Sequence, residues 1–200
     1  MKTVVVATRN RGKQREIECC LDGVVDEVLC AADFEAFPET VEDGCTFEEN
    51  ALKKAREAMQ FTGMPALADD SGLVVDVLGG APGVYSARYA GEGAGDAANN
   101  LKLLDALEGV ALDSRKAAFV CSLAFVAPDG TERLFSGRIE GHIIEEFRGD
   151  GGFGYDPLFL VDRFNKTMAE LAMEEKNLIS HRGQALKAFK LFLDECGDQY

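Results

Sequence analysis

Two adjacent carboxylates, Asp69 and Asp70, directly follow a short apolar run and precede Ser71 and Gly72. Carboxylate oxygens at the end of a strand are ligands that Mg²⁺ prefers, and a glycine lets the backbone approach whatever the metal binds. The same residue types also form ordinary solvated turns between strands. Taken alone, the segment favours such a turn, and a metal site requires support from the rest of the chain.

A second group of candidates lies between an expected strand over residues 3–7 and an expected helix over residues 13–21. The P-loop motif is excluded, because it needs glycine and Ser or Thr where this chain has Ala7 and Gln14. Free N–H groups at a helix start and a lysine ammonium still suit one phosphate. An exposed polar connector is an equally good interpretation. The candidates are Thr8, Arg9, Asn10, Arg11, Gly12 and Lys13.

Residues 149–154 match the GxGxxG pattern, but they are not a dinucleotide-binding fingerprint. The residues before them are too polar for a buried strand, and Pro157 prevents a helix from starting there. We expect a flexible loop that closes around a ligand, with Phe153 or Tyr155 stacking on a ring. The alternative is an ordinary surface loop, which rarely carries two aromatic residues.

Lys176, His181 and Arg182 supply hydrogen-bond donors just before the last expected helix. On their own, these residues are better explained as solvated charges beside a helix cap at Ser180. Combined with the other motifs, they predict a site for a nucleotide and a divalent metal, with phosphates at Lys13 and the metal at Asp70 and a nearby acid.

Periodicity predicts a single α/β domain over residues 1–200 with a mixed sheet. A capping box between Thr46 and Glu49 predicts the start of a helix. Expected strands also lie on either side of the acidic turn, and two long strands are joined at Pro128-Asp129-Gly130. The expected strands cover 3–7, 64–68, 73–78, 117–127 and 132–145, and helices are expected over 13–21, from 46, over 99–107 and over 180–196.

The net charge, the length of the apolar segments and the spacing of the cysteines exclude several classes of protein. The formal net charge of -14 excludes a nucleic-acid polymer as partner, since such partners need a basic surface. No segment approaches the roughly 20 apolar residues of a membrane span, so we expect a cytoplasmic protein without a membrane partner. The six cysteines show no metal-ligand spacing and are interpreted as reduced core thiols.

Seven ordered blocks of sequence resemble the inosine triphosphate pyrophosphatase family. They cover residues 7–13, 46–51, 67–73, 79–89, 152–157, 174–177 and 180–186. The resemblance implies an elongated, two-lobed α/β fold with a central mixed sheet flanked by helices, a cleft between the lobes, and a homodimer. It also implies Mg²⁺-dependent hydrolysis of ITP, dITP or XTP, small-molecule substrates, to the nucleoside monophosphate and pyrophosphate.

Carried over by position, the resemblance makes Asp70 the proton acceptor and a metal ligand, and Glu42 the second metal ligand. Asp69 is then a supporting residue, and Lys53 is a weaker candidate for a phosphate contact. Arg9 stands where the family often has a smaller residue. The implied substrate contacts are Thr8, Arg9, Asn10, Arg11, Gly12, Lys13, Ser71, Phe153, Gly154, Tyr155, Asp156, Lys176, His181 and Arg182.

Donors from Arg182 or His181 aimed at the purine 6-oxo group would discriminate against ATP, which carries an amino group there. Two other classes of protein stay open. A nucleotide sensor would keep the loops without hydrolysing anything, and a protein-interaction domain would bind no nucleotide.

Overall fold

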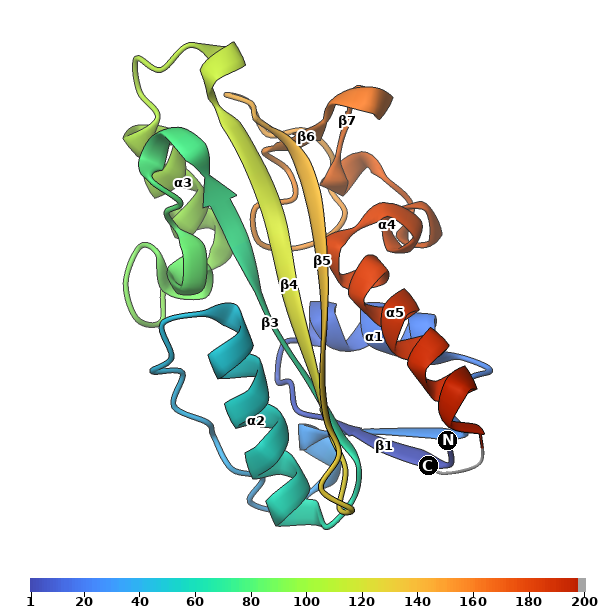
Figure 1. Ribbon diagram of the computed structural model, residues 1–200. Helices are drawn as coiled ribbons and strands as arrows, with labels where there is room; N and C mark the ends of the chain where they lie inside the picture. Colours follow the sequence, from blue (N-terminus) through green and yellow to red (C-terminus); the bar gives the residue numbers. More distant parts are fainter. Residues whose placement is uncertain (198–200) are drawn as a thin grey trace. The chain divides into compact units, whose positions relative to one another are not determined.

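The structure is a computed structural model that describes residues 1–197 (Figure 1). Strands and helices alternate along most of the chain. The strands are β1 (Thr3–Val6), β2 (Glu27–Cys30), β3 (Ala66–Val75), β4 (Lys116–Val126), β5 (Glu132–Ile143), β6 (Phe159–Val161) and β7 (Lys166–Thr167). The α-helices are α1 (Arg11–Leu21), α2 (Phe47–Thr62), α3 (Asp96–Ala106), α4 (Met173–Ile179) and α5 (His181–Cys196).

The strands form one seven-stranded sheet in the order β2-β1-β3-β4-β5-β6-β7. Strand β1 pairs in parallel with both β2 and β3. Strand β6 pairs antiparallel with β5 and β7. The predicted α/β class with a mixed sheet is therefore confirmed.

The acidic turn predicted at Asp69 and Asp70 is wrong, because β3 runs without a break from Ala66 to Val75. Asp69 and Asp70 are only 2% and 5% exposed. Asp69 is paired with Arg182 and Asp70 with Lys54, both buried cations, so neither carboxylate needs water. Since both charges are satisfied inside the protein, the backbone can continue as a strand where the sequence pattern indicated a bend.

The chain divides into two compact units, which are described separately. The first comprises residues 1–70, 121–137 and 181–197, and the second comprises residues 71–120 and 138–180. The expected single domain over residues 1–200 and the expected cleft both stay predictions.

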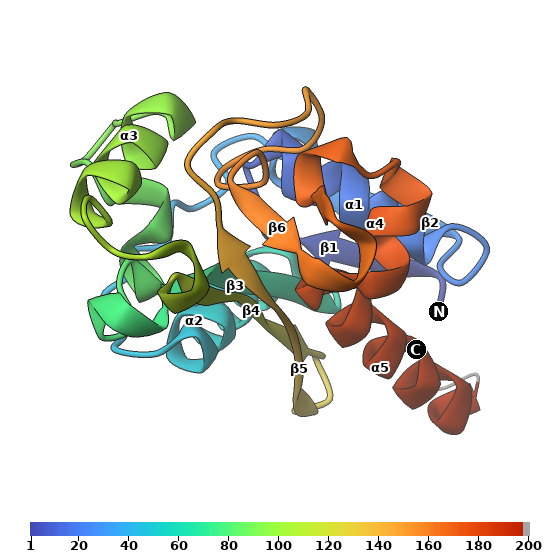
Figure 2. The same ribbon diagram turned by 90° about the horizontal axis from the view of Figure 1, so that it is seen from above.

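In the first unit, helices cover both faces of the sheet. Helices α1 and α5 lie side by side although they are far apart in sequence (Figures 1 and 2). They pack with Leu67 of β3 in one apolar cluster, whereas α2 packs with Ala68 in another. Successive residues of a strand point to opposite faces. Asp69 therefore lies on the α1/α5 face and Asp70 on the α2 face.

The second unit has its own apolar core, built around Leu103 of α3, Phe119 of β4 and Phe159 of β6. Three of its elements were not predicted from the sequence: β6, β7 and α4. They have three, two and seven residues. Elements this short leave too few positions for a periodic pattern.

The cysteines are all free thiols, but they are not all in the core. Cys30 and Cys121 are buried, whereas Cys19 and Cys45 are exposed, and the prediction of core thiols is wrong for this second pair. Cys19 lies on α1 between the buried Ile17 and Leu21, on the outward side of the helix. Among residues 1–197, no helix has the length and apolarity needed to cross a bilayer.

Candidate active site

The carboxylate of Asp69 is enclosed by two cations. Lys13 Nζ lies 2.8 Å from Oδ1, and Arg182 Nη2 lies 2.9 Å from Oδ2. Burial alone would raise the pKa of Asp69, but Arg182 and Lys13 outweigh it and hold the pKa well below its usual value. Asp69 is thus a permanent anion inside the first unit.

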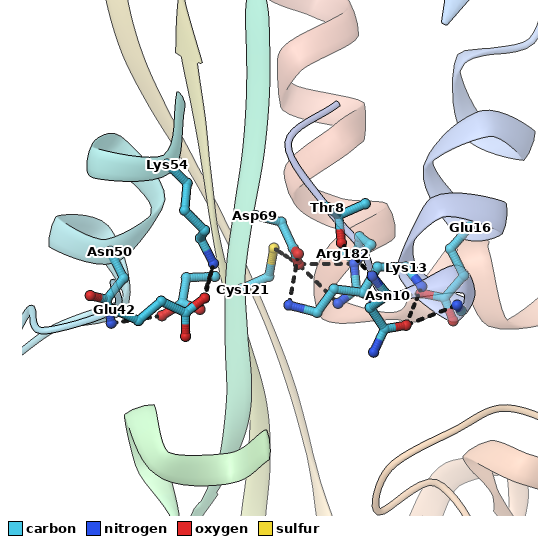
Figure 3. A network of polar contacts seen from close by, with 12 residues as sticks. Thr8, Asn10, Lys13, Glu16, Glu42, Asn50, Lys54, Asp69, Cys121 and Arg182 are labelled. Carbon is cyan, nitrogen blue, oxygen red and sulfur yellow. Dashed lines mark hydrogen bonds and ion pairs between the residues drawn. The ribbon is translucent and has the colours of Figure 1, made fainter. Parts of the chain in front are cut away.

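Arg182 links this anion to a second one. Its Nε donates to Asp69 Oδ2 at 3.0 Å, and its Nη1 donates to Glu16 of α1. Cys121 Sγ lies 3.7 Å from the same Asp69 oxygen, and burial raises the pKa of this thiol. Glu16, Arg182, Asp69 and Lys13 therefore form a buried chain of alternating charges, on one side of β3 in Figure 3.

Asp70 has a different environment on the opposite face. Lys54 Nζ lies 2.9 Å from its Oδ1, and Asn50 donates to its Oδ2 at 3.2 Å. Burial raises the pKa of Asp70; Lys54 and Lys13 oppose this, while the negative charge of Glu42 adds to it. Asp70 is therefore the carboxylate that accepts a proton more readily than an ordinary aspartate.

Lys54 also holds Glu42, because its Nζ lies 2.8 Å from Glu42 Oε1. Burial would lower the pKa of Lys54, but the attraction of Asp70 and Glu42 outweighs it and the pKa is raised. Figure 3 shows Glu42, Asn50 and Lys54 together on the side of β3 opposite to Lys13 and Arg182. One ammonium thus bridges two carboxylates.

The start of α2 positions this second cluster. Thr46 accepts a hydrogen bond from Glu49 N–H, as the predicted capping box requires, but the Glu49 carboxylate accepts from Cys45 N–H instead of Thr46 N–H. Asn50 Oδ1 accepts from Gly44 N–H at 2.8 Å, and a Cβ at Gly44 would lie 2.6 Å from this oxygen. Glycine therefore lets the loop that carries Glu42 approach α2 closely.

The predicted phosphate loop begins α1, but its N–H groups are less free than expected. Asn10 caps the helix and accepts from Gly12 N–H and Lys13 N–H at 2.8 and 3.0 Å. Thr8 Oγ1 accepts from Asn10 N–H. Arg9 Nη2 donates to the carbonyl of Phe37 at 2.9 Å, so Arg9 ties this loop to the segment that leads to Glu42. Arg11 is exposed.

In the second unit, the glycine loop closes around Asp156. This carboxylate accepts from Phe153 N–H at 2.9 Å and lies 2.5 Å from Lys176 Nζ. Lys176 Nζ also lies 5.0 Å from the centre of the Phe153 ring. Tyr155 is buried and donates to the Ser86 carbonyl, and its contact with a ligand stays a prediction. Ser71 is half-buried on β3.

Two predicted base-reading residues open α5, and both are buried. Arg182 is 1% exposed and donates to Asp69 and Glu16, and its contact with a purine carbonyl stays a prediction. A Cβ at Gly137 of β5 would overlap the carbonyl oxygen of His181, so only glycine fits at position 137. Close packing against β5 thus fixes the start of α5.

Several residues that build these clusters were missed in the sequence. Lys54 lies at the carboxylates, whereas its neighbour Lys53, the weaker phosphate candidate, pairs with Asp43 at 2.6 Å near the surface. Asp96 accepts from Gly154 N–H, and Asn100 donates to the Gly154 carbonyl. The capping box did predict α2, but only the helix phase separates Lys54 from Lys53. The helix expected over 99–107 corresponds to α3 (Asp96–Ala106), but no pattern pointed to the contacts of Asp96 and Asn100 with Gly154.

Within residues 1–197, no group of three or more His, Cys, Asp or Glu side chains is arranged to hold a metal ion. The carboxylates that converge on one point in the first unit are Glu42 and Asp70. Fold and site together define an α/β protein with a mixed sheet and two adjacent, lysine-paired carboxylates on one strand.

The chain belongs to the Ham1 family, whose model matches residues 4–192. The dITP/XTP pyrophosphatase of Geobacter sulfurreducens is 59% identical over 190 residues, covering 95% of this chain and 96% of the relative. That of Bacillus licheniformis is 51% identical over 195 residues, covering 98% and 100%. A solved HAM1 protein from Coxiella burnetii matches with a TM-score of 0.87 at 43% identity, covering 98% of this chain and 100% of that one. The predicted family resemblance is confirmed.

Proposed function

We propose that this protein is a nucleoside triphosphate pyrophosphatase that hydrolyses deaminated purine nucleotides, ITP, dITP and XTP, to the monophosphate and pyrophosphate. The observation that carries this proposal is the identity of 51% to 59% with relatives named dITP/XTP pyrophosphatase, over nearly the whole chain. Such a reaction removes non-standard purines from the nucleotide pool.

We assign Mg²⁺ to Glu42 and Asp70. The fit rests on their two carboxylates, which face one cation, since Lys54 Nζ lies 2.8 Å from Glu42 and 2.9 Å from Asp70. Mg²⁺ is typically held by one or two carboxylates together with substrate phosphates. When bound, it would neutralise phosphate oxygens and lower the pKa of a water molecule.

Asp70 is our candidate for the general base. Its raised pKa makes it a better proton acceptor than an ordinary aspartate, and a base works best when its pKa approaches the working pH. Asn50 and Lys54 each bond one of its oxygens, so the orientation of the carboxylate is fixed. Asp70 would orient the attacking water and accept its proton.

We assign the phosphates to the loop from Thr8 to Lys13. Lys13 Nζ lies 2.8 Å from Asp69, and the lysine side chain is still 16% exposed. Arg182 would act here by neutralising Asp69, which lets Lys13 share its charge with a phosphate. The other proposed substrate contacts are Ser71, Phe153, Gly154, Tyr155, Asp156, Lys176 and His181.

Selection against ATP would depend on the 6-oxo group that hypoxanthine and xanthine share. Guanine carries this group as well, so rejection of GTP requires an unfavourable contact with its exocyclic 2-amino group. A donor aimed at this oxygen faces an amino group in ATP and is left unpaired, which lowers the rate by orders of magnitude. Arg182 already donates to two carboxylates, which favours His181 for the direct contact.

The test is product analysis with ITP, dITP, XTP, GTP and ATP in the presence of Mg²⁺. We expect pyrophosphate and monophosphate from the first three, with much slower release from ATP and GTP. Orthophosphate as first product would identify a γ-phosphatase instead. Binding of ITP without turnover would identify a nucleotide sensor.

The remaining parts of the proposal concern assembly and location. We propose a cytoplasmic homodimer that acts on free nucleotides and not on nucleic acid. The net charge of -14 supports the last point, because a phosphate polymer would be repelled. Light scattering on the purified chain tests the dimer, and a monomer at micromolar concentration would contradict it.

A further inference from the structure

Two neighbouring lysines of α2 have very different surroundings. The side chain of Lys53 is 35% exposed, and it pairs with Asp43. The side chain of Lys54 is only 10% exposed, and its Nζ lies 2.8 Å from Glu42 Oε1 and 2.9 Å from Asp70 Oδ1. Both side chains have the same length and charge, so the difference arises from the phase of the helix alone.

The position of Lys54 Nζ matters because the same two carboxylates are the proposed metal ligands. Both oxygens lie within hydrogen-bond distance of one nitrogen, so they converge on one point. Mg²⁺ binds carboxylate oxygens at about 2.0–2.1 Å, and an ion held by both oxygens needs that point for itself. An ammonium and a divalent cation cannot share it, since they would overlap and repel each other.

We propose that Lys54 is an internal counter-ion that competes with the metal for Glu42 and Asp70, so that the metal gains the site only as Lys54 leaves. This inference rests on the proposed function, because it takes Glu42 and Asp70 as the metal ligands. It makes Lys54 a residue that sets the order of binding, a role beyond that of a charge near the site.

Lys54 compensates the negative charge of the two carboxylates when no metal is bound. Two carboxylates in a largely buried position are costly unless a cation compensates them. Lys54 supplies that cation when the metal is absent. A lysine has a flexible four-carbon stem, and a polyanionic ligand gives its ammonium an alternative partner. Binding of the nucleotide and of the metal are therefore positively coupled, and the metal alone binds weakly.

The experiment measures binding of Mn²⁺ alone, by electron paramagnetic resonance, to the nucleotide-free protein at pH 8. Mn²⁺ serves as the probe because it takes the same oxygen ligands as Mg²⁺. Lys54→Met keeps the apolar stem and removes the charge, and Lys53→Met is the matched control. We expect Lys54→Met to bind Mn²⁺ about tenfold more tightly than wild type or more, and Lys53→Met to match wild type.

The gain must depend on the two carboxylates. Adding Glu42→Gln to Lys54→Met should therefore abolish it. Unchanged or weaker Mn²⁺ binding by folded Lys54→Met would overturn the inference, as would a gain that survives Glu42→Gln.

A second measurement is made on the wild-type protein, so its outcome does not depend on a substitution of Lys54. The ammonium resonances of ¹⁵N-labelled wild type are followed during titration with Mg²⁺, and Lys54→Arg serves only to assign the signal. We expect the Lys54 signal to change in proportion to metal occupancy while Lys53 stays constant. A Lys54 signal that is constant up to saturation would refute the competition.

The outcomes separate this inference from the proposed function. If wild type releases pyrophosphate from ITP but Lys54→Met gains no metal affinity, the competition is refuted and the reaction stands. If wild type releases no pyrophosphate from any deaminated nucleotide, the proposed function itself fails, whatever the metal affinities.

Discussion

The two faces of β3 carry neighbouring aspartates whose surroundings shift the carboxyl pKa in opposite directions. On the α1/α5 face, Asp69 contacts two cations, Lys13 and Arg182, and its pKa is well below normal. On the α2 face, Lys54 is shared between Asp70 and Glu42, and the pKa of Asp70 is raised. A cation on each of its oxygens makes Asp69 a structural anion, whereas Asp70 shares a single ammonium with Glu42 and is left able to bind a proton or a metal. Because successive side chains of β3 point to opposite faces, the residue that serves stability, Asp69, is kept apart from the residue proposed for the chemistry, Asp70.

The largest expected effect comes from Asp70→Asn. Turnover of ITP should fall by about 10³-fold or more, because the base and one metal ligand are lost together. Stability should change by no more than about 1 kcal/mol, since the amide removes a buried charge next to Glu42. Pyrophosphate release and urea denaturation measure the two quantities, and a large loss of stability would break the contrast between the faces.

Asp69→Asn should have its main effect on folding. It leaves Arg182 and Lys13 with an uncompensated positive charge, and we expect a loss of about 3–5 kcal/mol in the free energy of unfolding. Urea denaturation followed by circular dichroism measures it, because the chain has no tryptophan to report by fluorescence. A variant as stable as wild type would show that the charge chain contributes nothing.

The pH dependence of stability should have opposite signs at the two sites. The folded pKa of Asp70 is raised, so its contribution is present below the unfolded value of about 3.9 and is lost as the pH rises through the folded pKa. The folded pKa of Asp69 is lowered, so its contribution is present above about 3.9 and is lost as the pH falls through the folded pKa.

We therefore expect the stability of wild type relative to Asp70→Asn to decrease with rising pH, and its stability relative to Asp69→Asn to increase. Thermal unfolding in metal-free buffer over an acid series measures both differences. Slopes of the same sign would mean that the two carboxylates do not differ as described.

The smallest effect is expected for an ion pair at the surface. Arg56 bonds Glu132 through two nitrogens at 2.7 Å, with geometry as good as that of the buried pairs, yet both side chains are well exposed. Glu132→Gln should cost about 0–1 kcal/mol, because water and salt screen the pair. The same urea denaturation serves here, and a cost near that of Asp69→Asn would contradict the role given to burial.

The sequence predicted the parts of the site that local patterns determine. Helix α1 follows from the spacing of Ile17 and Leu21, and α2 follows from Thr46 and the apolar positions after it. The uninterrupted course of β3 could not be predicted, because the cation that holds Asp69 on the α5 side, Arg182, is 113 positions away. A polar run looks like a turn until its distant partners are known.

Long-range packing also explains other contacts that local patterns did not predict. The Tyr155 hydroxyl donates to the Ser86 carbonyl, which lies 69 positions earlier in the chain. Lys53 and Lys54 are indistinguishable by residue type, and only the phase of α2 relative to β3 decides which one is buried. The family resemblance suggested candidate site residues but did not specify these contacts.

The labelling rate of Cys121 measures how often the surroundings of the buried charge chain open. Its thiol lies against Asp69, is shielded from solvent, and resists ionisation, so a thiol reagent can reach it only when the surroundings open. The exposed Cys19 and Cys45 react without any opening. Cys30 is buried as well, so labelling has to be measured at Cys121 itself; its slow rate, compared with the immediate labelling of Cys19 and Cys45 in the same molecule, reports how often the interior around Asp69 opens.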